Sequence, residues 1–251
     1  FLDELVDHAF ILTMENSKRP YMYNYRKNPP CSKLTVQFNK GYNCPGKDLK
    51  IKRSNEDLKH ATRNIFNKIL QSDIKRALIL EDDFEIAGDA DVHVPAIVRF
   101  FASHNPIVYN LGPCWFRLTV PIGDHFYSVN AAGGHGYIVT KDYIRKFINN
   151  YDKFPHVDDV KTINGGTYFY KVPIIYQTIP DTDNTANWGG VIETDIIRSI
   201  FRELQLDNHT GNFRTLFNIS MTRVHLTWSL IGIFSVWILV SSIVIHTRGL
   251  V

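Results

Sequence analysis

Short apolar runs and segments of helical periodicity follow one another along most of the chain. Apolar runs bounded by turn residues predict strands at residues 8–13, 34–38, 77–80, 107–111, 126–129, 137–140 and 172–178. Apolar positions at helical spacing predict helices at residues 54–69, 92–103 and 141–151. Strands that alternate with helices in this way predict an α/β domain with a mostly parallel sheet.

Local signals refine the ends of these elements. Residues 54–57 (SNED) have the S-x-x-[DE] pattern of a helix start, and that helix leads into the strand at 77–80. This order predicts a βαβ-like unit with a right-handed crossover. Pro95 is expected in the first turn of its helix, where proline is tolerated. Pro173 is expected at the start of the last strand, or else that strand lies at a sheet edge.

A charge-free segment, residues 226–245 (LTWSLIGIFSVWILVSSIVI), follows the predicted domain. A helix of about 20 residues crosses ~30 Å of hydrocarbon. Trp228 lies near its start, and Arg223 and Arg248 flank it as interfacial anchors do. We therefore expect a single-pass membrane anchor here, preceded at residues 191–225 by an amphipathic helix and a juxtamembrane linker. The alternative, a buried core helix, would need apolar partners on every face.

The orientation of this anchor is open. Arg214 and Arg223 on one side against Arg248 on the other slightly favour a cytosolic catalytic part. The N-glycosylation sequons that begin at Asn208 and Asn218 would indicate the opposite side if they are used. The sequence thus predicts a membrane location without fixing the side.

Composition excludes several classes of protein. The chain has 251 residues and a formal net charge of +3, with basic residues scattered among acidic ones, so no nucleic-acid surface is indicated. Cys31, Cys44 and Cys114 lie far apart without C-x-x-C spacing, which excludes a zinc knuckle and allows at most one disulfide. This cysteine usage favours a reducing environment. The length fits one α/β domain with an appendage.

Three carboxylates, Glu81, Asp82 and Asp83, follow the apolar run at residues 77–80. They cannot continue the strand into a dry core without a counter-charge, so we expect them at the strand's exit. Ligands bind at the carboxyl ends of strands in open α/β sheets, and carboxylates there suit a divalent cation. The alternative is an acidic turn solvated at the surface.

Other polar groups also follow predicted strands. Asn16 and Arg19 come after the first strand, where arginine can meet a phosphate; solvation at the surface explains them equally well. His135, in a glycine-rich bend, is interpreted as a packing histidine. The loop after the last strand carries three possible oxygen ligands, Asp181, Asp183 and Asn184, and one indole, that of Trp188. The default interpretation is turn chemistry for the oxygen ligands and packing for the tryptophan. No G-x-G-x-x-G or Walker pattern supports a Rossmann or P-loop interpretation.

The order of these motifs over roughly residues 8–190 resembles glycosyltransferase family 25, which includes lipo-oligosaccharide and collagen galactosyltransferases. ALILEDD matches the family's apolar strand with Glu-Asp-Asp in full, and GGHGYIVTKDYIRKF is similar to its glycine, tyrosine and Ser/Thr segment before a helix. FILTMENSKR is similar to the opening strand, with Thr13-Met14 in place of Asn-Leu. Lys59-His60 stands where the family has Ser-His, and PHVD, ending at Asp158, is similar to its Pro-x-x-Asp.

The resemblance implies a GT-A-like nucleotide-sugar transferase domain over residues 1–190. It implies that Glu81 and Asp83 hold Mn²⁺ or Mg²⁺, a role for which hard oxygen ligands are suited. It also implies contacts to a UDP-sugar donor from Asn16, Arg19, His60 and Asp82. Asp158 would be the base of an inverting reaction, with a helix N-cap as the alternative.

These expectations lead to a metal-dependent inverting glycosyltransferase that moves galactose or glucose from a UDP-sugar to a glycan or hydroxylated protein acceptor. The departures at Thr13-Met14 and Lys59 motivate a different hypothesis: a catalytically silent, membrane-tethered protein that binds glycans or assists assembly. A metal-dependent hydrolase is disfavoured, since no histidine-rich ligand set accompanies the acids.

Overall fold

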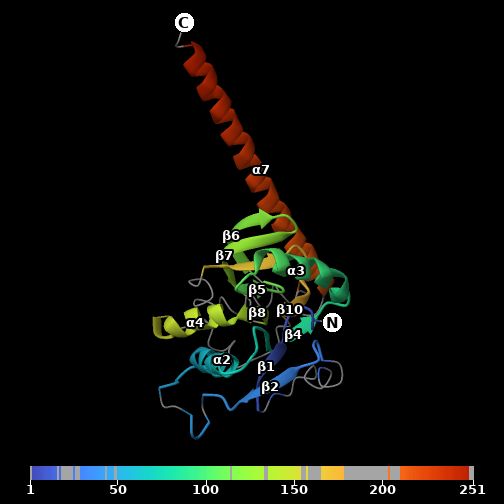
Figure 1. Ribbon diagram of the computed structural model, residues 1–251, viewed down its shortest axis with the longest axis vertical. Coiled ribbons are helices and arrows are strands. Elements are labelled where there is room, and N and C mark those ends of the chain that lie inside the picture. The colour runs from blue at the N-terminus through green and yellow to red at the C-terminus, as the bar shows by residue number, and fades with distance from the viewer. Residues whose placement is uncertain are drawn as a thin grey trace.

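A computed structural model describes residues 2–15, 17, 25, 29–42, 44–47, 50–113, 115–132, 135–153, 157, 165–177, 203 and 210–248. In chain order its elements are β1 (His8–Met14), β2 (Leu34–Asn39), α2 (Ser54–Leu70), β3 (Arg76–Glu81), β4 (Phe84–Ile86), α3 (Ala90–His104), β5 (Val108–Asn110), β6 (Trp115–Ile122), β7 (His125–Ala132), β8 (Gly136–Thr140), α4 (Lys141–Asn149), the 3₁₀ turn η1 (Tyr151–Lys153), β9 (Thr167–Tyr170), β10 (Ile175–Gln177) and α7 (Thr210–Arg248). A layered domain carries α7 as a long projecting rod (Figure 1).

The main sheet has eight strands in the order β2-β1-β3-β8-β5-β9-β7-β6. Six of the eight run in one direction, and β8 and β7 run against them. The expected α/β class and mostly parallel strand direction are therefore confirmed. The ladder itself is mixed, because β8 is inserted antiparallel between β3 and β5.

Apolar side chains cover both faces of the sheet, as the continuous apolar runs of its strands require. In β1, Phe10 and Leu12 point to one face, and Ala9 and Ile11 point to the other. Helices α2 and α4 cover the first face with a cluster that includes Ile65, Phe66, Ile69, Tyr143, Ile144 and Phe147. Helix α3 and the start of α7 cover the second face, and in Figure 1 α3 lies on the side of the strands away from α2 and α4.

Two glycines let β10 approach the sheet closely. A Cβ on Gly112 would lie 1.8 Å from the carbonyl oxygen of Ile175, and one on Gly136 would lie 2.8 Å from its Cγ2. Any larger residue would push Ile175 away. A strand was expected at residues 172–178, and β10 covers Ile175–Gln177 of that range. It pairs antiparallel with β4 in a separate two-stranded sheet.

Helix α3 begins at Ala90, earlier than expected, so Pro95 lies inside the helix and not in its first turn. Proline has no backbone N–H, so the hydrogen bond to the carbonyl of Asp91 is missing there. The expectation about Pro95 was wrong because the periodic signal used for it began at Val92. The helix ends at His104 and is capped by Asn105, whose φ of 42° is the left-handed conformation typical of helix ends.

The first turns of α7 are docked on the domain. Phe213, Phe217 and Met221 are buried at helical spacing and join the core on the α3 face. The guanidinium of Arg214 donates to both carboxylate oxygens of Asp89, each at 2.7 Å. These turns fall in the stretch for which the sequence predicts an amphipathic helix and a linker; residues 191–202 and 204–209 lie outside the described residues.

Beyond Trp228 the helix leaves the domain. Among the described residues, α7 is the one helix that is long and apolar enough to cross a membrane by length and composition; the candidate span is Gly211–Ser242, and its most apolar 18-residue window has a mean hydropathy of 1.8. No part of its most apolar window is buried in the fold. A core helix would be covered on its apolar faces, so this exposure agrees with the expected anchor.

Candidate functional site

The three predicted carboxylates lie at the carboxyl end of β3. Glu81 is the last residue of the strand, and Asp82 and Asp83 form the turn that follows. The parallel register places Glu81 beside Leu12 of β1, so the exits of β1 and β3 lie side by side. The expected position at a strand exit is confirmed.

Two hydroxyl groups from the exit of β1 hold Asp82. Thr13 Oγ1 donates to Asp82 Oδ2 at 2.7 Å, and Ser17 Oγ donates to the same oxygen at 3.1 Å. Thr13 is buried, and the Met14 carbonyl oxygen, another acceptor within reach of its hydroxyl, is farther away at 3.4 Å. Hydrogen bonds to a charged acceptor are stronger than neutral ones, and this pair fixes the orientation of the carboxylate.

Asp83 is held by the small sheet. Its side chain is 8% exposed, and Gln177 Nε2 donates to Asp83 Oδ2 at 3.0 Å. Gln177 is the last residue of β10 and pairs with Phe84, directly after Asp83. The β4–β10 pair therefore connects this aspartate to a segment more than 90 residues away in sequence.

Glu81 is half-buried and its backbone N–H donates to the carbonyl oxygen of His135 at 3.3 Å. His135 is fully buried, as the packing interpretation requires. The bend before β8 thus contacts the carboxylate turn through the main chain.

The neighbouring exit of β2 carries a polar network that sequence reasoning missed. The Lys47 ammonium contacts Asp57 Oδ1 and Asn39 Oδ1, each at 2.6 Å, and Asn39 Nδ2 donates to Asp57 Oδ2 at 2.8 Å. Asp57 is 3% exposed and needs this counter-charge. A signal was available, because Asn39 directly follows the strand predicted at residues 34–38 and Asp57 lies in the first turn of a predicted helix. The exits of β2, β1 and β3 together form a polar edge of the sheet.

The donor set is compatible with one type of metal site. Within the described residues, no group of three or more His, Cys, Asp or Glu side chains is arranged to hold an ion. Glu81 and Asp83 supply two carboxylates, and Mg²⁺ is commonly bound by one or two carboxylates together with substrate phosphates. The residues fit a hard cation whose coordination a bound ligand completes, and they do not form an all-protein cage.

The residues at the Lys59-His60 motif lie on α2. His60 is half-exposed, and its Nδ1 lies 3.4 Å from Asn64 Nδ2, one turn further along the helix. Lys59 is buried and donates to the carbonyl oxygen of Tyr151 at 2.8 Å, with its ammonium 4.2 Å from the centre of that ring. Burial lowers the pKa of Lys59. Lys59, which stands where the pattern of glycosyltransferase family 25 has a serine, therefore connects α2 to η1.

The remaining predicted site residues are outside the part of the chain that the structure describes. They are Asn16 and Arg19 after the first strand, Asp158 with its neighbour Asp159, and the later loop residues Asp181, Asp183, Asn184 and Trp188. Their assigned roles remain predictions.

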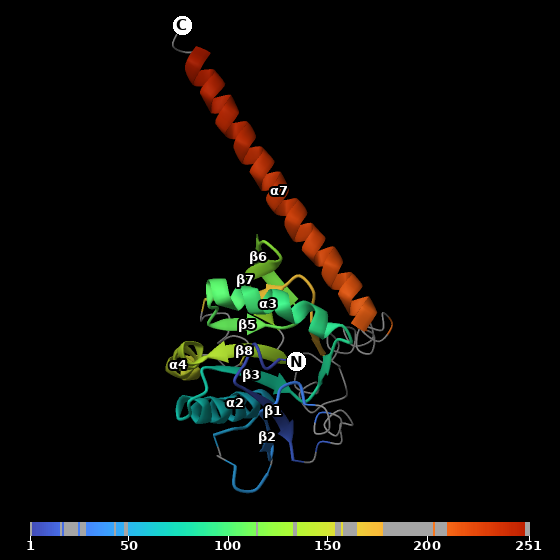
Figure 2. The same cartoon turned by 45° about the vertical axis from the view of Figure 1, so that its right-hand side comes forward.

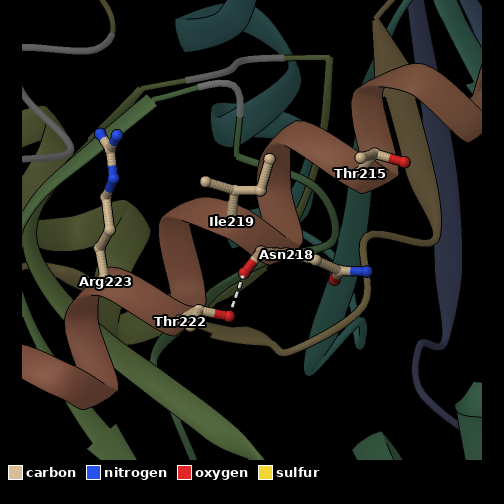
Figure 3. A pocket seen from close by; sticks show the side chains of 5 residues that line it. All are labelled: Thr215, Asn218, Ile219, Thr222 and Arg223. Carbon is tan, nitrogen blue, oxygen red and sulfur yellow. Dashed lines mark hydrogen bonds between the residues drawn. The ribbon is translucent and has the colours of Figure 1, made fainter.

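A shallow hollow lies along one side of α7 and takes its lining from that helix alone: Thr215, Asn218, Ile219, Thr222 and Arg223 (Figure 3). Thr222 Oγ1 donates to the Asn218 carbonyl at 2.9 Å. None of the three carboxylates contributes to it, so the hollow and the polar sheet edge are different places.

No family model matches the chain, and no curated protein matches it in sequence. Solved structures similar to it include UDP-glucose pyrophosphorylase with UDP-glucose (10% identity, 65% of this chain and 72% of that chain covered, TM-score 0.38) and the same enzyme without ligand (9%, 65% and 72%, 0.37). HddC from Yersinia pseudotuberculosis is similar over 67% of this chain and 70% of its own, at 12% identity and a TM-score of 0.34. Likeness at this level assigns neither a fold family nor an activity.

Proposed function

We propose that the chain is a membrane-anchored glycosyltransferase of the family 25 type, with a GT-A-like domain. It moves galactose or glucose from a UDP-sugar to a glycan or to a hydroxylated protein side chain. The observation that carries this proposal is the carboxylate turn at the exit of β3, in which Asp82 is oriented by Thr13 and Ser17 and Asp83 by Gln177.

A sugar-nucleotide donor leaves behind a diphosphate on which negative charge accumulates. Mn²⁺ or Mg²⁺ held by Glu81 and Asp83 would neutralise that charge and orient the phosphates. Asp82 would bind the nucleotide sugar as an acceptor of hydrogen bonds from its hydroxyl groups. Because hydroxyl donors from β1 already fix this carboxylate, little side-chain freedom is lost when the donor binds.

The acceptor hydroxyl needs a base on the face of the sugar opposite the leaving group. We assign this role to Asp158, which takes the proton in a single inverting displacement without a covalent intermediate. Asn16, Arg19 and His60 would complete the donor site, where the arginine suits a phosphate.

We also propose that α7 anchors the domain in a membrane. Its charge-free stretch at residues 226–245 has the length that a bilayer requires, and its described side chains past Trp228 lie outside the folded core.

The decisive experiment compares wild type with Asp83→Asn in UDP-sugar turnover. Full-length protein in detergent is supplied with UDP-galactose or UDP-glucose and Mn²⁺, and released UDP is measured by mass spectrometry. Loss of a ligand carboxylate should lower turnover by about 100-fold or more.

Asp142→Asn is the matched control. Asp142 is an exposed acid on α4 in an ion pair with Arg145, so turnover should be unchanged. Equal turnover by wild type and Asp83→Asn would overturn the metal role of Asp83. Calorimetry that finds glycan binding but no UDP-sugar binding would instead favour the catalytically silent protein.

A further inference from the structure

An apolar patch is exposed on the β6–β7 hairpin. Leu118 in β6 is 76% exposed, the largest fraction among the large apolar residues that the structure describes. Val129 lies across from it on β7 and is 43% exposed, and Val120 on β6 is 37% exposed. We call these three residues the hairpin patch.

The backbone at the centre of this patch is strained. Leu118 has a φ of 48°, in the left-handed region, which a bulky residue rarely adopts. The strand ladder pairs Arg117 and Thr119 with β7 but passes over Leu118. Backbone strain clusters at functional sites, and contiguous exposed apolar patches mark interaction surfaces.

Helix α7 fixes the position of the patch relative to the charge-free segment. Trp228 Nε1 donates to the carbonyl oxygen of Thr119, next to Leu118, at 2.7 Å. His225, one turn earlier, packs edge-on against Phe126 of β7 at 5.2 Å between ring centres. The hairpin and the start of the charge-free segment are therefore in direct contact, and both views show β6 next to α7 where the helix leaves the domain (Figures 1 and 2).

The length of the charge-free segment fixes where the boundary of a bilayer would lie along α7. A helix needs about 20 residues to cross the hydrocarbon, and residues 226–245 form a charge-free stretch of that length between Arg223 and Arg248. The boundary of a bilayer around α7 must then lie within the turn that contains Trp228. This is the turn that contacts β6, so the hairpin patch lies at the same depth.

We propose that the hairpin patch inserts into the lipid interface beside α7, so that the bilayer is the partner of this surface. The proposal rests on the proposed membrane anchoring of α7. Apolar side chains at an interface reach about 5–10 Å into the boundary between headgroups and acyl chains. A second contact of this kind prevents the domain from rotating about the helix axis.

The test uses the full chain in phosphatidylcholine vesicles, with an environment-sensitive fluorophore on Leu118→Cys. Cys44 and Cys114 are replaced by serine, and this background without an added cysteine measures any labelling of the buried Cys31. We expect emission to be quenched by lipids with a nitroxide near the glycerol end of the acyl chain and shielded from aqueous iodide.

Val92→Cys is the matched control. Val92 is 69% exposed in the first turn of α3, close to Asp89. The partner of Asp89 on α7 is Arg214, which lies about 21 Å of helix before Trp228. A label on Val92 should be quenched by iodide and not by the nitroxide lipids.

A further variant separates insertion of the protein from insertion of the dye. With the label on Val129→Cys, Leu118→Asn should reduce quenching by the nitroxide lipids, because asparagine tolerates the left-handed backbone but not the lipid interface. Quenching unaffected by Leu118→Asn would overturn the proposal.

Flotation on a density gradient distinguishes the two possible failures. Protein that does not float with the vesicles would overturn both the anchor and the hairpin contact. Protein that floats while iodide quenches the Leu118 label as strongly as the Val92 label would overturn the hairpin contact alone. A label shielded from both quenchers would show that another protein surface covers the patch, which also overturns the proposal.

Discussion

His125 is a buried histidine at the start of β7. Its ring stacks on Phe100 with 4.0 Å between ring centres, and its Nδ1 lies 2.8 Å from the Tyr109 hydroxyl. Burial lowers the pKa of His125 to about 4, and the nearby charge of Asp124 only partly opposes this. Lys171 and His104 face it as well and lower the pKa further. The folded protein therefore keeps this imidazole neutral.

An unfolded histidine has a pKa of about 6.5, so between pH 6.5 and 4 the unfolded chain binds a proton that the folded state does not. Stability should fall as the pH falls through this window, by about 1 kcal/mol per pH unit from this residue. His125→Gln should remove that slope in urea unfolding curves recorded from pH 4 to 7. His60→Gln on α2, which covers the other face of the sheet, is the control and should keep the wild-type slope; the same slope in both variants would contradict the prediction.

At the scale of single residues, the sequence located the carboxylates but not their partners. Glu81, Asp82 and Asp83 could be placed because charged groups cannot extend a buried strand. Thr13 could not be identified as the donor to Asp82, because nothing local couples residues 69 positions apart. Thr13 departs from the pattern of glycosyltransferase family 25, which has asparagine there, and in the structure its hydroxyl donates a hydrogen bond to the acidic turn.

At the scale of elements, the first turns of α7 are attached to the domain by an apolar stripe and an ion pair. Phe213, Phe217 and Met221 are buried, and Arg214 also donates from Nε to the Tyr176 hydroxyl at 3.0 Å. Hydrogen bonds from Arg214 lower the pKa of Asp89 to about 2. This carboxylate therefore stays charged at neutral and mildly acidic pH.

Arg214→Ala should loosen the docking of α7 by about 1–2 kcal/mol, since charge-assisted hydrogen bonds are lost from a partly exposed site. Hydrogen–deuterium exchange of residues 213–221 should then be roughly tenfold faster. Arg145→Ala removes an exposed ion pair on α4 with side chains 60% and 71% exposed, and should leave that exchange unchanged. Equal exchange in wild type and Arg214→Ala would show that the apolar stripe alone holds the helix.

Apolar runs predicted strands that overlap β1, β2, β3, β5, β7, β8 and β10, and helical spacing predicted α2, α3 and α4, whereas β4, β6 and β9 were missed. β6 mixes charged, apolar and proline residues because it is an edge strand with one face at the surface. β4 has three residues, too few for a periodic signal. The antiparallel insertion of β8 depends on pairing between distant segments, which no local pattern specifies.

At the scale of the whole molecule, we expect the domain to fold without the charge-free part of α7, provided that the chain is cut after the buried turns of that helix. A chain ending at residue 225 keeps the buried stripe and should melt cooperatively near the wild-type temperature. A chain ending at residue 209 loses Phe213, Phe217 and Met221 from the core, which should cost on the order of 4 kcal/mol. Thermal denaturation with a dye that binds exposed apolar surface compares the two, and equal melting temperatures would contradict the assigned role of the stripe.

The strand order has a consequence for the acceptor. The carboxylates follow β3, and the strand next to α7 is β6, five places further along the sheet. With about 4.8 Å between neighbouring strands, the two lie on the order of 24 Å apart. Figure 1 shows the sheet ascending from β2 to β6 toward the projecting rod. If α7 lies in a bilayer, as we propose, an acceptor of the proposed reaction would have to stand well above the lipid to reach the carboxylates, and a group at headgroup height would be too far from them.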